Sequence, residues 1–233
     1  MKYLFSTFCL LLILSGCSSP SDQEMLLTGE VKGLKKGTLL LQKLEDTLFV
    51  SVDSMVVDGL PVFNFSDEII SPEMYYLTLT FQDSSNLVKR LPFFAEPGKI
   101  NIQTTLKDYE NRAVITGSRN QEKIDEYNIL MKRYNDQNLE LIEEDFTARM
   151  EGNDSLSDEL QNKQRRLLKL KYLAAINFAK NNNDLEVAPY LMLAKAYDVQ
   201  VTYLDTIYNS LTPKIKDSKY GKALESLIKF RNK

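Results

Sequence analysis

The sequence predicts an α+β protein in which an N-terminal antiparallel β-sandwich-like domain precedes an α-helical region. From about residue 25 to Gly117, short runs of alternating apolar and polar residues recur about every ten residues between turn residues, a pattern typical of a sandwich or a partly closed barrel. Beyond Ser118 the apolar residues recur instead with the helical period of about 3.6. Gly and Pro also become scarce there until close to the end.

Eight strands are expected in the first part. They span Leu26 to Val31, Thr38 to Leu44, Phe49 to Val57, Val62 to Glu68, Met74 to Phe81, Leu87 to Phe94, Lys99 to Thr104 and Arg112 to Thr116. Asp58-Gly59 favours the positive φ angles of a tight hairpin turn between two of them. In Glu96-Pro97-Gly98 the Pro and the Gly favour a tight turn before the strand from Lys99. In the fifth strand Tyr75, Leu77, Leu79 and Phe81 fall on one face, which predicts that this face lies in the core.

Two long helices and three shorter ones are expected in the second part. The first begins near Arg119 and stops before Gly152, with one apolar stripe made of Ile124, Tyr127, Met131, Tyr134, Leu141, Ile142, Phe146 and Met150. Ser155 and Asp158 resemble a capping box for the second, which runs to the break at residues 181–183 and should pack on the first as a hairpin. The shorter helices span about Val187 to Tyr197, Val201 to Leu211 and Lys219 to Phe230, with Thr212-Pro213 as a helix start.

The N-terminus looks like a bacterial lipoprotein signal. Lys2 precedes the apolar run Leu4 to Leu14, which is too short to span a bilayer of about 30 Å, and Leu14-Ser15-Gly16-Cys17 follows. We therefore expect residues 1–16 to be a signal peptide, Cys17 to be lipidated and to hold the chain on a membrane, and residues 17–24 to be a flexible tether. The alternative is an ordinary secretory signal in which the cysteine is incidental. The two domains would then be residues 25–118 and 119–233.

Composition excludes several kinds of chemistry. The 233 residues include no His and only two Cys, of which Cys9 would leave with the signal and Cys17 would carry lipid. Ser-His-Asp hydrolysis, thiol catalysis and standard zinc sites are therefore not expected. The formal net charge is −3, or −4 (28 basic against 32 acidic residues) without residues 1–16, so no nucleic-acid partner is expected either.

Two charged segments of the expected helices are candidate sites. Glu143-Glu144-Asp145 is the densest acidic run, but neighbouring helical positions point about 100° apart, so we interpret it as a solvated helix face rather than a metal site. The second segment is basic and consists of Lys163, Arg165, Arg166, Lys169 and Lys171. It could bind phosphate headgroups or an acidic partner. The favoured interpretation is that it forms the solvent-exposed side of an amphipathic helix, with Asp158 and Glu159 balancing its charge.

Two further groups of residues have weaker functional interpretations. Asp53-Ser54 is interpreted as a polar pair at a sheet edge, because nothing nearby in the sequence would activate the serine as a nucleophile. Four tyrosines are spaced to line a helical groove for a peptide or glycan, although core packing with the hydroxyl at the rim is the favoured interpretation. They are Tyr190, Tyr197, Tyr203 and Tyr208. No catalytic residue, metal ligand or cofactor is predicted.

A set of short motifs in fixed order resembles a known family over about residues 25 to 128. The motifs are Gly29-Glu30-Val31-Lys32-Gly33-Leu34, Val52-Asp53-Ser54, Val56-Val57-Asp58-Gly59, Phe63-Asn64-Phe65, Pro72 before Tyr75, Glu96-Pro97-Gly98 and Thr116-Gly117-Ser118. Together they resemble the β-rich domain of unknown function 4369 of Bacteroidetes envelope lipoproteins. In many relatives a thioredoxin-like domain with a Cys-x-x-Cys pair follows; this chain lacks that pair, so redox activity is not carried over.

The resulting functional expectation is a non-enzymatic lipoprotein of the cell envelope, on the outer membrane of a Gram-negative bacterium. It would act as a binding, accessory or scaffold module, with an envelope protein such as a separately encoded thioredoxin-like protein as its partner. The helical region or a sheet edge would be the contact. The alternative is a surface receptor or adhesion module for glycan or peptide.

Overall fold

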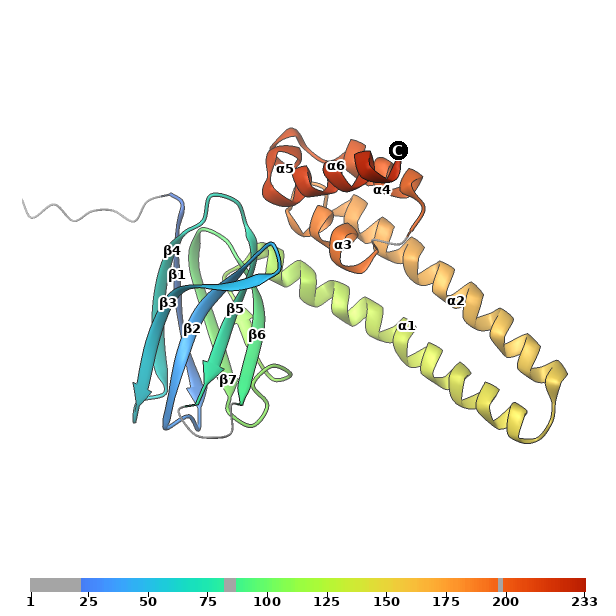
Figure 1. Ribbon diagram of the computed structural model, residues 1–233, viewed down its shortest axis with the longest axis horizontal. Coiled ribbons are helices and arrows are strands. Elements are labelled where there is room, and N and C mark those ends of the chain that lie inside the picture. Colours follow the sequence, from blue (N-terminus) through green and yellow to red (C-terminus); the bar gives the residue numbers. More distant parts are fainter. Residues whose placement is uncertain (1–21, 82–86, 197–198) are drawn as a thin grey trace, which may run out of the picture.

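The computed structural model describes residues 22–81, 87–196 and 199–233 and confirms the α+β class. Strands come first and helices follow (Figure 1). The strands are β1 Glu24–Lys32, β2 Lys36–Glu45, β3 Leu48–Asp58, β4 Val62–Glu68, β5 Glu73–Thr80, β6 Val88–Ala95, β7 Gly98–Thr105 and β8 Val114–Thr116. The helices are α1 Arg119–Met150, α2 Asp154–Asn181, α3 Val187–Lys195, α4 Val201–Ser210, α5 Pro213–Asp217 and α6 Lys219–Arg231.

The strands form two four-stranded sheets, in the orders β4-β1-β7-β8 and β3-β2-β5-β6. Neighbouring strands are antiparallel except β1 and β7, which run parallel from Met25 opposite Gly98 to Lys32 opposite Thr105. The turns expected at Asp58-Gly59 and Glu96-Pro97-Gly98 are present, with Gly59 at φ +98° and Gly98 at φ +118°. Glu24, which we assigned to the tether, already pairs with Glu68 as the first residue of β1.

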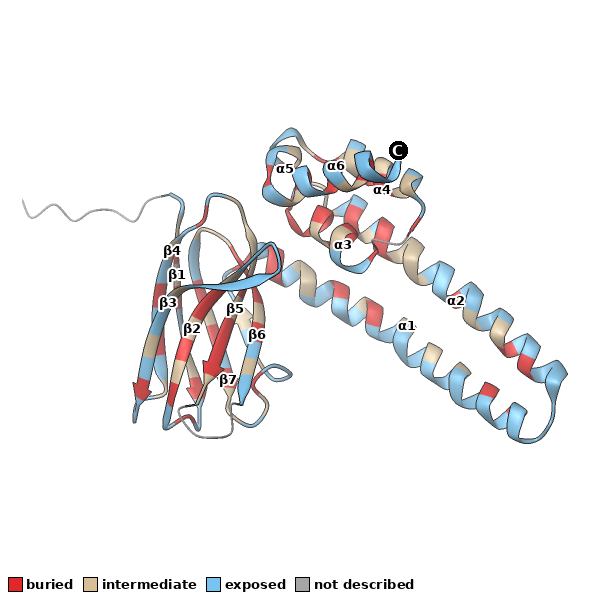
Figure 2. Ribbon diagram, viewed as in Figure 1, coloured by how far each residue is buried: buried red, intermediate tan, exposed pale blue. Residues whose placement is uncertain are grey.

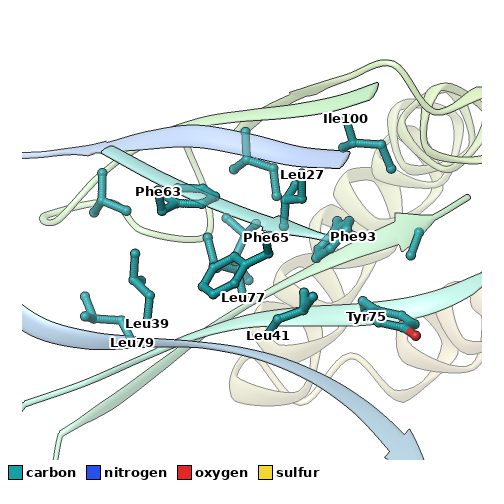
Figure 3. Packing of buried hydrophobic residues seen from close by; sticks show 14 of the residues in the cluster. Leu27, Leu39, Leu41, Phe63, Phe65, Tyr75, Leu77, Leu79, Phe93 and Ile100 are labelled. Atoms are coloured by element: carbon teal, nitrogen blue, oxygen red, sulfur yellow. The ribbon is translucent and has the colours of Figure 1, made fainter. Parts of the chain in front are cut away.

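The sandwich core lies between the two sheets (Figure 3). Inward-facing side chains alternate along the strands as expected, so that Tyr75, Leu77 and Leu79 of β5 are all buried. Phe63 and Phe65 of β4 fill the space opposite them, with ring centroids 5.9 Å apart. Close-packed aromatic and branched side chains of this kind supply most of the stabilisation of such a domain.

The helices α1 and α2 form the expected antiparallel hairpin, which extends away from the sandwich and from α3–α6 (Figure 1). One capping prediction was wrong. Ser155 is not the cap of α2; the helix begins at Asp154, and the Asn153 side chain caps it by accepting a hydrogen bond from the Leu156 N–H at 3.2 Å. Asn is as good a cap as Ser, and it lies at the end of the turn after Gly152.

The single apolar stripe predicted for α1 was also wrong in its second half. Tyr127 and Met131 are buried as expected, but Ile142, Phe146 and Met150 are 47%, 66% and 74% exposed. Figure 2 shows this far part of the hairpin as mainly exposed, with isolated buried positions. Successive residues of the predicted stripe shift gradually around the helix axis. Ile142, Phe146 and Met150 therefore no longer lie on the side of α1 that contacts α2.

Candidate functional site

The junction between the sandwich and the helices is built on β6. Side chains alternate between the two faces of a strand, so Phe93 points into the sandwich core while Phe94 joins the core of the helical region. Both are fully buried. The ring of Phe94 packs edge-on against Tyr190 of α3 and Tyr220 of α6, with centroids 5.8 Å and 6.1 Å away. One sandwich residue therefore anchors two helices.

A hydrogen-bonded network fixes where α1 and α3 begin. The Glu96 carboxylate, in the turn after β6, accepts hydrogen bonds from the Arg119 N–H at 2.6 Å and from the Asn120 amide at 2.7 Å. The same Asn120 amide reaches the buried Glu186 carboxylate at 3.2 Å, and its oxygen accepts from the Val187 N–H at 2.8 Å. A carboxylate at a helix N-terminus is stabilised by the unpaired N–H groups there. From the sequence, Glu96 was expected only as part of a turn, and Asn120 was not expected to have a role.

The C-terminal helix α6 is attached to the same sheet. The Met74 N–H donates to the Tyr220 hydroxyl oxygen at 2.9 Å, and the Lys219 N–H donates to the Ser71 hydroxyl at 3.0 Å. Lys219 also forms an ion pair with Glu73. Burial raises the pKa of Tyr220 well above its usual range, so the phenol stays protonated at physiological pH.

A groove with a volume of about 370 Å³ opens beside this junction, between β5, β6, the β7–β8 connection, α1 and α3. Its lining includes the rings of Tyr76 and Tyr190 together with Asp125, Glu110 and Lys195. Desolvation raises the pKa of Asp125, although the hydrogen bond from the Gln121 amide at 2.9 Å acts in the opposite direction. A mixed lining of aromatic faces and a few charges is suited to a small polar ligand or a short peptide.

The second candidate surface is the far half of the α1–α2 hairpin, where polar contacts between the helices accompany the buried apolar side chains of Ala148, Leu160 and Leu167. The Asp145 carboxylate accepts hydrogen bonds from Arg149 at 2.7 Å and from the Ser157 hydroxyl at 2.6 Å. The Gln164 amide donates to the Leu141 carbonyl at 3.3 Å, and Lys171 reaches the Asn135 side chain at 2.7 Å. These contacts align the helices.

Apolar side chains of the same part of α1 lie outside the seam. Leu139, Ile142, Phe146 and Met150 are spaced by three, four and four residues, so they form one stripe, and their exposed fractions run from 47% to 74%. The stripe begins directly after Asn138, which lines with Asn135 a groove of about 470 Å³ whose other rim includes Arg165 and Leu168 of α2. We call these four residues the hairpin stripe.

The predicted charged segments have mixed outcomes. Glu143 and Glu144 are exposed as expected, but Asp145 is not part of a solvated face, because it is only 7% exposed. Its hydrogen bonds, first from Arg149 and then from Ser157, lower its pKa.

The basic segment of α2 lies largely on the wet side of the helix, as interpreted. Lys163 pairs with Glu159 at 2.9 Å, and Arg165 donates to the Asn162 side chain at 2.7 Å. Arg166 and Lys169 are exposed, whereas half-buried Lys171 spans the hairpin seam to Asn135.

Asp53-Ser54 lies on β3, an edge strand of its sheet, which confirms the edge prediction. Its hydrogen bond is local, from the Ser54 N–H to the Asp53 carboxylate at 2.7 Å. The tyrosines do not line one groove. Tyr190 lines the junction groove and Tyr203 a separate surface groove beside Lys169, whereas Tyr208 lies under Lys216. Tyr197 lies outside the described residues.

Cys17 and the expected signal peptide also lie outside the described residues. Within residues 22–81, 87–196 and 199–233, no helix combines the length and the apolar character needed to cross a bilayer. In the same ranges, no three acidic, Cys or His side chains gather as a metal ion would require.

Comparison with known families gives a match over the sandwich. Residues 25–124 match the family described as Domain of unknown function (DUF4369). The DUF4369 match takes in β1 to β8 apart from Glu24, together with the first turn of α1, and it supports the resemblance of the ordered motifs to this domain. It stops before the far half of the hairpin, so the hairpin stripe lies outside the matched segment.

No curated protein matches the sequence. The solved structure of "pT26-6p" is similar to this chain with a TM-score of 0.23 and 10% identity. The alignment covers 84% of this chain and 42% of that one, so the chain spans less than half of the length of that protein. At this TM-score the similarity supports no conclusion about fold or function.

Proposed function

We propose that this chain is a lipid-anchored envelope protein that acts as a non-enzymatic binding, accessory or scaffold module. Support for the anchor is the order of Lys2, the apolar run and Leu14-Ser15-Gly16-Cys17. With about 0.8 kcal/mol for each buried CH₂, two or three acyl chains on Cys17 would hold the chain on the membrane permanently. The outer membrane of a Gram-negative bacterium is the proposed location, in line with the resemblance to envelope lipoproteins.

The hairpin stripe is the observation that carries the binding role. Its four apolar side chains remain exposed, whereas the buried side of the same part of α1 includes the Asp145 carboxylate beside Ala148. Contiguous exposed apolar side chains rimmed by polar residues are typical of protein contact sites. The hairpin is therefore proposed as the contact arm of the protein, and a thioredoxin-like envelope protein is among the partners that the resemblance suggests.

Proximity labelling in the native envelope tests this role. The wild type is compared with Cys17→Ala, which would remove the anchor, and with Ile142→Gln/Phe146→Gln, which removes the apolar centre of the stripe. Ile129→Gln is the matched control, because Ile129 is 70% exposed on another face of α1.

A neighbouring protein that is labelled by the wild type and by Ile129→Gln, but not by the stripe variant, supports the contact arm. Its loss in Cys17→Ala supports the anchor. Identical labelling by the wild type and the stripe variant would contradict the contact role of the hairpin.

The second candidate function is a receptor or adhesion module, favoured by the junction groove with its two tyrosine rings and three charged side chains. Protease treatment of intact cells would cleave the chain if it faces outward and spare it if it faces the periplasm. Binding of peptides and glycans to the full chain, compared with Tyr76→Ala, measures the contribution of the groove. If Tyr76→Ala leaves every detected affinity unchanged, the groove is not the binding site.

A further inference from the structure

We propose that the junction groove binds the amino-terminal residues of a peptide, whose ammonium group is held by the carboxylates of Asp125 and Glu110. This inference rests on the second candidate function, which assigns ligand binding to the groove, and it names the chemical class of the ligand. Three features of the lining carry it: carboxylates without a cation, tyrosine rings with free hydroxyls, and an apolar floor.

The two carboxylates of the groove have no cationic partner among the described residues. Asp125 lies on α1 and Glu110 in the connection between β7 and β8, and neither takes part in an ion pair within the described part of the chain. The hydrogen bond that Asp125 accepts comes from the uncharged Gln121 amide. Desolvation raises the pKa of Asp125, and no cation of the chain acts against it. A positively charged ligand would stabilise such a carboxylate.

The lining as a whole has an excess of negative charge. Lys195, exposed in the last turn of α3, is the one cation among the described lining residues, against two carboxylates. A neutral glycan would remove water from these carboxylates without supplying a charge, and an acidic glycan would be repelled. An ammonium group supplies a positive charge together with three hydrogen-bond donors. The charges of the groove therefore favour a cationic ligand over a glycan.

The two tyrosines of the groove are held in place by the fold. The Tyr76 ring lies edge-on to Phe49, with centroids 4.9 Å apart. The Tyr190 ring packs against Phe94 at 5.8 Å and against Tyr220 at 5.3 Å. Neither groove hydroxyl forms a hydrogen bond with another described residue.

These hydroxyls can bind the backbone of a peptide. Burial raises the pKa of Tyr76 and of Tyr190, so both phenols stay protonated at neutral pH and can donate to a carbonyl oxygen. A simple alkylamine would use the carboxylates but would leave both hydroxyls without an acceptor. A peptide amino terminus provides the ammonium group and the first carbonyl oxygens next to it.

The size and the floor of the groove limit how much of the peptide it holds. Leu91, Pro92 and Ile115 form an apolar part of the lining that can contact a ligand side chain. The volume of about 370 Å³ is near the lower end of the range of about 300–1,000 Å³ that is usual for small-molecule sites. We therefore expect two or three residues in the groove, with the rest of a longer peptide in solvent.

Retention of peptide mixtures by the full chain tests this inference. Full-length protein in detergent is equilibrated with tripeptides that are randomised at each position without Lys, Arg, His or Cys and are amidated at the C-terminus. One mixture has a free amino terminus and the other is acetylated. Peptides retained on ultrafiltration are quantified by mass spectrometry, with protein-free detergent as background. The free mixture should be retained about tenfold more strongly, because acetylation removes a charge-assisted hydrogen bond.

Matched variants identify the groups responsible. Asp125→Asn/Glu110→Gln removes both charges of the groove and should reduce retention of the free mixture about tenfold, to the level of the acetylated one. Glu122→Gln/Glu126→Gln is the control, because it removes two carboxylates of α1 that lie outside the lining. Tyr76→Phe should weaken retention of both mixtures by about two- to tenfold through loss of one hydroxyl donor. Circular dichroism checks that each variant is folded.

Equal retention of the free and acetylated mixtures, or wild-type retention by Asp125→Asn/Glu110→Gln, would overturn the inference. The receptor function fails separately, because neutral malto- and xylo-oligosaccharides are offered in the same assay. If these are retained and Tyr76→Ala releases them, the groove is a binding site but its ligand is not an ammonium group. If neither peptide nor oligosaccharide is retained, both the inference and the receptor function of the groove are refuted.

Discussion

Replacement of Phe94 by Ala should separate the helical region from the sandwich, whereas replacement of its neighbour Phe93 should weaken the sandwich itself. Both side chains are 0% exposed on the same strand, but they belong to different cores. The pair is therefore matched in chemistry, burial and strand position. It differs only in the face of β6 on which the ring lies.

The magnitude follows from what each ring contacts. Truncating a fully buried Phe to Ala costs about 3–5 kcal/mol of the free energy of unfolding. Phe94 also loses two edge-on ring contacts, with Tyr190 at 5.8 Å and Tyr220 at 6.1 Å, and such pairs are each worth about 0.5–1.5 kcal/mol beyond buried area. We expect a loss near the upper end of the range for Phe94→Ala, concentrated in the attachment of α3 and α6.

Hydrogen exchange measured by mass spectrometry distinguishes the two variants. Phe94→Ala should speed exchange in α3 and α6 more than in β1, β2 and β7, and Phe93→Ala should do the reverse; urea unfolding followed by circular dichroism gives the total loss. The reasoning would be refuted by Phe94→Ala with a loss under about 1 kcal/mol, or by the same pattern of exchange in both variants.

Three further substitutions test single groups. Asn120→Ala should lower the free energy of unfolding by about 1–3 kcal/mol, because the Val187 N–H loses its acceptor. An unchanged midpoint of urea unfolding would contradict the role of the network. Asp125→Asn should stabilise the protein at pH 7 but not below about pH 4, since a raised native pKa gives stability that is lost as the pH rises through it. Asp145→Asn should destabilise the protein at pH 7, and this loss of stability should fade as the pH falls through the lowered native pKa of Asp145. If the effect of either Asp substitution does not depend on pH, titration of that carboxylate is not its cause.

The strands could be predicted because local residues determine both their faces and their ends. Alternation in Met74 to Phe81 places Leu77 and Leu79 inward whatever the partner strands are. Asp58-Gly59 and Glu96-Pro97-Gly98 allow backbone conformations that few other residues adopt, so the turns appear where they were expected. The parallel pairing of β1 with β7 was not predictable in this way, since it joins segments far apart in the sequence.

The junction was missed for a related reason. Asn120 is an ordinary polar residue in the first turn of a helix, and its role depends on Glu96 and Glu186 arriving from two other segments. Phe94 is one apolar residue among several in β6, and nothing local distinguishes the core that it joins from the core that Phe93 joins. Such roles depend on tertiary contacts, which a local pattern does not contain.

Helix α1 forms where it was predicted, but the prediction about its apolar side was wrong. The apolar residues of α1 do recur at helical spacing, and we assigned all of them to one apolar stripe. A periodic pattern states only that a helix has an apolar side, not that this side meets the neighbouring helix of the same chain. Here the neighbour is met by Asp145 and Ala148, both buried, while Phe146 beside them is exposed. An apolar side that the chain's own fold leaves uncovered is the reason why we propose the hairpin as a contact arm.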